Sequence, residues 1–135
     1  MLPFCGEEGV GVIPYNPIAG GLLSGKHSRT APPPEGSRFT LGTAGGLYQE
    51  RYWHDREFDT VEALRSLADA AGVSLVTLAV SWVLAHPAIT APIIGASRPE
   101  QLDDSLAAVE STLDPELKRQ LDELTHSYRM GDAPR

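Results

Sequence analysis

From residue 58 onward, apolar residues recur at helical spacing in four separate stretches. Their apolar positions are Phe58, Val61, Leu64, Leu67, Ala68 and Ala71; Leu75, Leu78, Ala79, Trp82 and Val83; Leu102, Leu106 and Val109; and Leu117, Leu121 and Leu124. This spacing predicts four amphipathic helices. Several ends are marked as well. The first helix stops at Gly72, Ser74 can cap the second, which ends before Pro87, and Asp114-Pro115 opens the fourth.

Two short apolar runs, at residues 10–15 and 91–94, have the length and composition of buried strands. Buried parallel strands need paired neighbours and covered faces, so two strands and four helices cannot close a sheet by themselves. The pattern therefore predicts that residues 1–135 form the last part of a larger α/β fold.

The segment at residues 16–55 lacks sustained periodicity and holds much of the proline and glycine of the chain. We predict one long ordered loop there, and loops of this length usually serve binding. At the other end of the chain, residues 129–135 are predicted to be a frayed tail.

The stretch IIGASRPEQL, at residues 93–102, carries the clearest candidate chemistry. A strand ends at Gly95, and Ser97 stands three residues before Glu100, which is the spacing of a capping box. A helix start offers free N–H groups and a positive dipole end, and Arg98 adds a full charge. These features indicate a phosphate site. The alternative is an ordinary strand-to-helix turn with a surface arginine.

Composition narrows the function classes. The chain has 135 residues, a length typical of one domain, and a formal net charge of -7. Such a charge disfavours nonspecific binding to nucleic acid or to anionic membranes. There is one cysteine, Cys5, and the first residues do not resemble a signal peptide, so we expect a cytoplasmic protein.

Four stretches together resemble the aldo-keto reductase family. They are VIPYNPIAGGLLSGK at 12–26, RYW at 51–53, LAVSWVL at 78–84 and the stretch at 93–102, in the order and at separations typical of the C-terminal part of that family. The resemblance implies the C-terminal portion of a (β/α)8 TIM barrel, with two core strands plus helices and the barrel incomplete. It also implies NADP(H) as cofactor and reduction of aldehydes and ketones by hydride transfer.

The same resemblance assigns cofactor contacts to the segment after the first strand, which includes the loop at 16–55. Tyr15 matches the aromatic residue that stacks on the nicotinamide, although its pattern also suits a half-buried tyrosine at a strand end. The turn under the pyrophosphate matches Asn16, Pro17, Ile18, Ala19 and Gly21, where small residues let backbone amides approach closely. Lys26 and Arg38 match basic residues of the loop over the cofactor, or are ordinary solvated charges.

The second set of contacts surrounds the adenosine. Ser97, Arg98 and Gln101 match the segment around the 2′-phosphate, where a cation and a hydroxyl favour NADPH over NADH. Asp104 and Ser105 match the positions of the adenine contacts, where the family often has Glu and Asn.

The catalytic tetrad of the family (Asp, Tyr, Lys and His) lies in earlier barrel strands, and no segment here matches it. We therefore expect no catalytic residue in this chain and assign no such role to Tyr48, Tyr52 or Tyr128. The histidines (His27, His54, His86 and His126) show no metal-ligand spacing and are expected at the surface or at caps, and Cys5 is expected to be structural.

Three functions stay open. The chain is part of a reductase, completed by an N-terminal barrel portion or by self-association; or it is a noncatalytic nucleotide-binding module; or it is a subunit-interaction remnant. The carbonyl substrate would be a small molecule bound only by the complete barrel.

Overall fold

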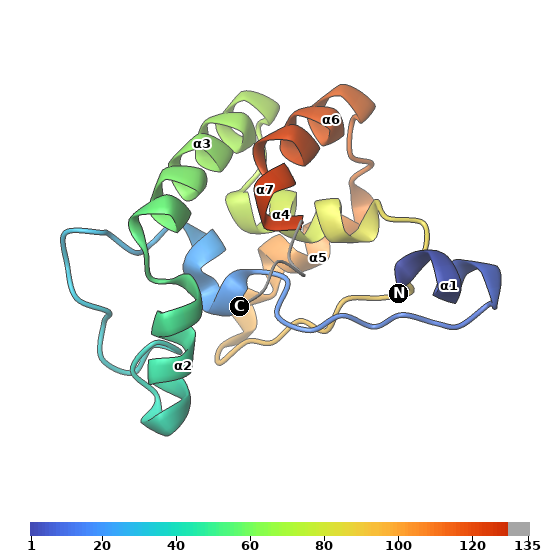
Figure 1. Cartoon of the computed structure of the whole chain (residues 1–135). Coiled ribbons are helices and arrows are strands. Elements are labelled where there is room, and N and C mark those ends of the chain that lie inside the picture. The colour runs from blue at the N-terminus through green and yellow to red at the C-terminus, as the bar shows by residue number, and fades with distance from the viewer. Residues whose placement is uncertain (130–135) are drawn as a thin grey trace.

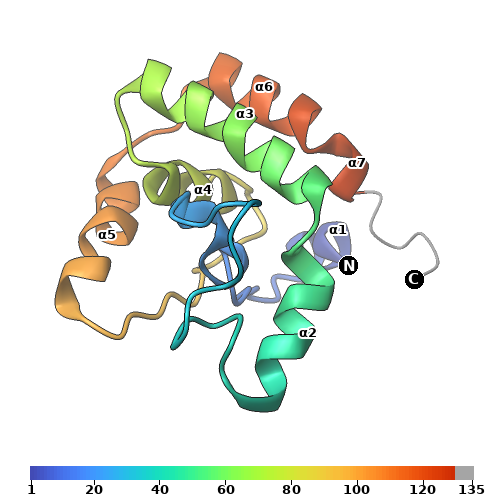
Figure 2. The same cartoon turned by 90° about the vertical axis from the view of Figure 1, so that its left-hand side faces the viewer.

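A computed structural model describes residues 1–129 (Figures 1 and 2). Its elements, in chain order, are α1 (Leu2–Glu7), the 3-10 helix η1 (Ala19–Ser24), α2 (Gly42–Tyr52), α3 (Asp55–Ala71), α4 (Leu75–Leu84), the 3-10 helix η2 (Pro99–Gln101), α5 (Asp103–Glu110), α6 (Pro115–Leu124) and α7 (His126–Arg129). Helices α3, α4 and α6 lie together, and α1 lies apart from them, joined to η1 by one extended segment that runs beside the extended segment between α4 and η2 (Figure 1).

The ends of α3, α4 and α6 confirm the predicted caps. Gly72 ends α3 in the left-handed conformation with φ 68°, and its N–H returns to the last turn. The Ser74 hydroxyl accepts a hydrogen bond from the Thr77 N–H at 3.0 Å, which starts α4. The Asp114 carboxylate accepts from two backbone N–H groups of the first turn of α6 at 3.0 Å each. Each cap satisfies backbone groups that a helix end leaves unpaired.

The two predicted strands are wrong as full strands. Residues 10–15 and 91–94 do run side by side and parallel, but they share a single bridge, between Tyr15 and Ile93. The Ile93 N–H donates to the Pro14 carbonyl at 2.7 Å. The Thr90 N–H also donates to the Val12 carbonyl at 2.8 Å. Pro14 and Pro92 have no N–H to donate, which limits the pairing, and within residues 1–129 neither segment has a second strand beside it. The apolar side chains stay exposed: Ile13 is 59% exposed and Ile93 54%.

The prediction of one long loop at residues 16–55 is wrong. It contains η1 and α2, and it supplies Phe39, which is fully buried. Helix α2 has the sequence GTAGGLYQERY, whose glycines hide any helical period. It is held by packing instead: Gly45 is buried, and a Cβ there would lie 2.8 Å from the Phe39 carbonyl oxygen. The short helix α1 was not predicted either.

The predicted capping box at the third helix is also wrong. The Ser97 hydroxyl and N–H both donate to the Gln101 side-chain oxygen, at 3.1 and 2.9 Å, and η2 has no side-chain cap. A short 3-10 turn precedes α5, which begins only at Asp103.

Helix α5 packs on α4 through small residues rather than through its predicted apolar stripe. Ser105 and Ala108 are buried, whereas Leu106 is 54% exposed and Val109 73%. The Thr77 hydroxyl of α4 donates to the Asp104 carbonyl at 2.7 Å. Small residues let the two helices approach closely enough for this bond, and the larger side chains therefore point away.

One apolar core joins η1, α3, α4 and α6. Its buried members are Leu22, Phe39, Phe58, Val61, Leu64, Ala68, Leu75, Leu78 and Leu121. Leu22 of η1 belongs to this core, so η1 connects the packed helices to the extended segment at residues 10–15. Of the predicted frayed tail, residue 129 closes α7, and residues 130–135 lie outside the described residues.

Among residues 1–129 no single helix is long and apolar enough to cross a membrane, and only α3 and α4 taken together, bent by 91°, meet that test. The same part of the chain contains no group of three His, Cys, Asp or Glu side chains that could hold a metal ion.

Candidate functional site

The bridge between Tyr15 and Ile93 sets the position of the candidate site. Because the two segments run parallel, the residues that follow them leave at the same end of the pair. Asn16 begins the turn that leads into η1, and Gly95 begins the turn that leads to η2 and α5. In barrels of alternating strands and helices, this end carries the functional groups. The two predicted cofactor segments therefore begin at neighbouring positions.

The first turn has an unusual backbone. Asn16 and Ala19 have positive φ angles, 64° and 50°, and Gly20 and Gly21 follow with 68° and 100°. These angles lie in the left-handed region. Asn tolerates it because its short polar side chain can hydrogen-bond locally, whereas Ala has no such compensation for the crowding of its Cβ. Non-glycine residues in such conformations concentrate at functional sites, where the surrounding structure holds them in place.

The amide groups of this turn are already used. The Ala19 N–H donates to the Asn16 carbonyl at 3.1 Å, and the Gly21 N–H donates to the Ile18 carbonyl at 2.9 Å. The Gly20 N–H donates to the Asn16 side-chain oxygen at 2.6 Å. An anion at this turn would therefore be held by side chains, not by the three amides that the small residues were expected to offer.

Arg38 lies against the turn, and Arg51 lies over the ring of Tyr52. The Arg38 side chain passes 3.6 Å from the position a Cβ would take on Gly20, and its guanidinium lies 5.7 Å from the centre of the Tyr48 ring. Hydrogen bonding to Tyr52 first, and then to Tyr15, raises the pKa of the Arg51 guanidinium. Arg51 was not among the predicted site residues, and its only sequence signal was its place beside Tyr52 in the RYW stretch. Together the two arginines make this turn basic in a chain of net charge -7.

The Tyr15 ring is available to a ligand. It is 69% exposed, and the bridge fixes the backbone that carries it. A flat ring held in this way can stack on another ring. Pro17 and Ile18 lie between Tyr15 and η1 and are partly buried, and Lys26 is exposed just after η1.

His27 was expected at the surface or at a helix cap, but the structure shows it partly buried. Its ring lies edge-on to Phe39 and Trp53, with ring centres 5.1 and 5.3 Å away. Burial first, and the charge of Lys26 second, lowers the pKa of His27. The neutral imidazole is therefore favoured, and it supports the loop after η1 as a packing residue.

The second turn holds Ser97, Arg98 and Gln101. The bonds from Ser97 to the Gln101 side chain close it, and Arg98 is exposed beside them. Acidic side chains follow at Glu100, Asp103 and Asp104, all exposed. Ser105 is buried, 6% exposed, which leaves it little surface for an adenine contact. Of the second predicted set, Arg98 is thus the residue best placed to meet an anion.

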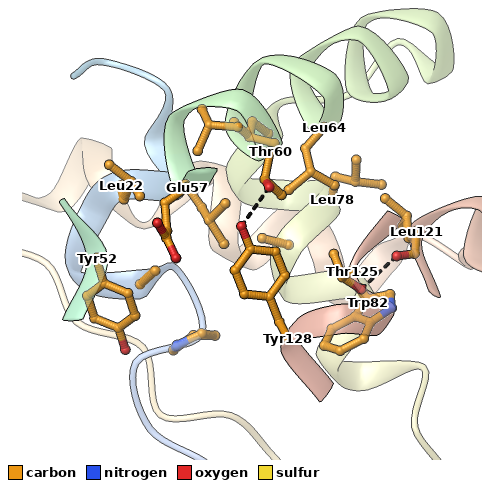
Figure 3. Close-up of a pocket in the computed structure, with 16 residues that line it drawn as sticks. Leu22, Tyr52, Glu57, Thr60, Leu64, Leu78, Trp82, Leu121, Thr125 and Tyr128 are labelled. Atoms are coloured by element: carbon orange, nitrogen blue, oxygen red, sulfur yellow. Dashed lines mark hydrogen bonds between the residues drawn. The ribbon is translucent and has the colours of Figure 1, made fainter. Parts of the chain in front are cut away.

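An apolar cavity of about 380 Å³ lies between η1, α3, α4 and the last helices, and Pro17 and Ala19 of the first turn also line it (Figure 3). Its lining includes Leu22, Leu64, Trp82 and Leu121, and the hydroxyls of Thr60 and Tyr128 are 2.7 Å apart at its wall. An apolar wall with its hydroxyls paired does not suit a phosphate.

Comparison with known proteins decides the family. A model of the aldo/keto reductase family matches residues 1–126. The chain belongs to the aldo/keto reductase family. This confirms the resemblance drawn from the sequence.

Curated relatives of this aldo/keto reductase carry different names. An uncharacterized oxidoreductase, YrpG, from Bacillus subtilis is 36% identical over 92% of this chain and 35% of its own length. The aflatoxin B1 aldehyde reductase member 2 of Rattus norvegicus is 32% identical over 82% of this chain and 33% of its own length. A probable voltage-gated potassium channel subunit beta of Arabidopsis thaliana is 34% identical over 82% of this chain and 33% of its own length. The chain thus spans about a third of the length of these relatives.

A solved structure shows the same relation at the level of the fold. A glycerol dehydrogenase of the aldo-keto reductase family from Gluconobacter oxydans superposes on this chain with a TM-score of 0.74 at 22% identity. The superposition covers 100% of this chain and 39% of that structure. The arrangement of helices and extended segments is therefore that of part of a family member.

Proposed function

We propose that this chain is the NADP(H)-binding C-terminal part of an aldo-keto reductase barrel, which reduces aldehydes or ketones when the barrel is complete. The observation that carries the proposal is the parallel bridge between Tyr15 and Ile93. It brings the turn after Tyr15 and the turn around Arg98 to one end of the pair, as a single extended dinucleotide requires.

The residues of the two turns fit such a ligand. Arg38 and Arg51 supply positive charge at the first turn, and Arg98 supplies it at the second. Guanidinium groups bind phosphate through charge-assisted hydrogen bonds, often in pairs. The exposed Tyr15 ring would stack on the nicotinamide and fix the face that it presents. When bound, NADPH supplies the hydride.

The remaining chemistry belongs to the complete barrel. The proton donor and its partners would come from a complementing N-terminal barrel portion, since no described residue here stands in a matching context. Self-association through the exposed extended segments is the other way to cover them. The single cysteine, Cys5, fits a reducing compartment, and we place the protein in the cytoplasm.

We expect Arg98→Ala to weaken NADPH binding about tenfold or more, because a hydrogen bond to a charged group contributes roughly 1.5–3 kcal/mol. NADH lacks the 2′-phosphate, so its affinity should stay nearly unchanged. Binding is measured by fluorescence titration of the barrel completed with the missing portion, with Arg119→Ala on the exposed face of α6 as the control. Equal losses for the two cofactors would show that Arg98 acts through the fold and that the 2′-phosphate assignment is wrong.

A further inference from the structure

We infer that Tyr52, at the end of α2, is a positioning residue that holds the turn after Tyr15 in its ligand-ready shape. The inference rests on the proposed function for the identity of the ligand. The geometry itself is independent of that ligand. Tyr52 is separated from Asn16 by 36 residues, and their side chains meet because α2 lies against η1 (Figure 1).

The direction of the hydrogen bonds fixes the role of each group. The Gly20 N–H can only donate, so the Asn16 atom that faces it at 2.6 Å is the carbonyl oxygen. The Asn16 amide nitrogen therefore faces Tyr52, and it donates to the phenol oxygen at 3.0 Å. Asn16 is held at both ends, by the turn that it closes and by α2.

This anchoring matters because the turn is strained. Asn16 and Ala19 both lie in the left-handed region, which only glycine adopts readily. Gly20 has no room for a side chain, since a Cβ there would lie 2.5 Å from the Tyr48 ring. The Asn16 side chain thus ties the strained residues to the helix that packs over them.

The same helix end also carries the charge of the site. The Arg51 guanidinium lies 5.8 Å from the centre of the Tyr52 ring. Hydrogen bonding to Tyr52 first, and then to Tyr15, raises the pKa of Arg51. Tyr52 therefore contacts two parts of the candidate site, the turn at Asn16 and the Arg51 cation. In Figure 3 the Tyr52 ring lies beside η1, at the edge of the apolar cavity.

The test uses Tyr52→Phe in the full 135-residue chain, which removes one oxygen and keeps the ring. Hydrogen exchange of the Gly20 amide, measured by NMR, should become about two- to tenfold faster, because a neutral hydrogen bond contributes about that factor. Tyr48→Phe is the matched control: it lies on the same helix and keeps the ring that packs on Gly20. Amides in the middle of α4 report global opening.

A double-mutant cycle sharpens the assignment. If Tyr52 acts through the Asn16 side chain, Tyr52→Phe should have no further effect on Gly20 exchange in an Asn16→Ala background. Three results would overturn the inference: unchanged Gly20 exchange in Tyr52→Phe, an equal effect of Tyr48→Phe, or a change matched by the α4 amides, which would show general destabilisation.

A titration with NADPH separates this inference from the proposed function. NADPH is titrated into the barrel completed with the missing portion, once with the unaltered chain and once with Tyr52→Phe, and we expect the variant to bind a few-fold more weakly. Equal affinities would reject the positioning role and leave the proposed function standing. No binding to either protein would count against the proposed function, while the Gly20 measurement would still decide the role of Tyr52.

Discussion

The 135-residue chain alone is expected to oxidise no NADPH above the buffer blank when it is mixed with a panel of aldehydes and ketones. General acid–base catalysis alone contributes about 10²–10⁴-fold, and orientation of the two reactants contributes further large factors. Acid–base catalysis and orientation both need groups that, as the family resemblance implies, lie in barrel strands before this segment. The measurement is the loss of NADPH absorbance with each carbonyl compound.

The control for this experiment restores the rest of a barrel. A chimera carries this chain in place of the matching segment of the rat aflatoxin B1 aldehyde reductase, of which the chain covers 33%. We expect the chimera to regain aldehyde-dependent oxidation of NADPH, with the unaltered rat protein as reference. Turnover by the isolated chain that survives repurification would contradict the account.

Phe39→Ala is expected to lower the free energy of unfolding by about 3–5 kcal/mol, the cost of removing a large buried ring and leaving a cavity. Phe39 is fully buried, and its ring lies 4.8 Å from that of Trp53 and 5.1 Å from that of His27. Urea unfolding followed by tryptophan fluorescence measures the change, because Trp53 reports on this contact.

Leu47→Ala is the matched control for Phe39→Ala. Leu47 lies on α2 and is 63% exposed, so its truncation should change the free energy of unfolding by less than about 0.5 kcal/mol. Similar losses in the two variants would show that the region at 16–55 is not packed around Phe39.

Helix ends were predictable because their causes are local. The caps at Gly72, Ser74 and Asp114 depend on a few neighbouring residues, and the structure confirms all three. The apolar stripes of α3 and α4 were predictable for the same reason, since each helix buries one face.

The errors arose where distant segments decide the structure. Helix α2 has no amphipathic period and exists through its packing on Phe39 and η1. The two extended segments form only one bridge because proline removes donors and each has one neighbour. On α5, close packing of Ser105 on α4 turned the larger apolar residues outward.

The candidate site shows the same division. The family resemblance assigned the two turns to one cofactor, and that assignment stays a prediction; the structure adds that the residues just before them, Tyr15 and Ile93, form a parallel bridge. The sequence did not reveal Tyr52 as a neighbour of the first turn, because its contact with Asn16 spans 36 residues. Side chains that far apart in the sequence carry no local signal of proximity.

The most direct test of the central claim is an amide NMR titration with NADPH. The isotopically labelled chain, completed by the remaining barrel portion, is titrated while its backbone signals are followed. The account predicts that the largest shifts occur in the two turns, at Gly21 and at Ser97 and Arg98, and that signals along the apolar cavity, such as Val61 and Leu121, move little. Shifts centred on that cavity, or no saturable shift at either turn, would contradict it.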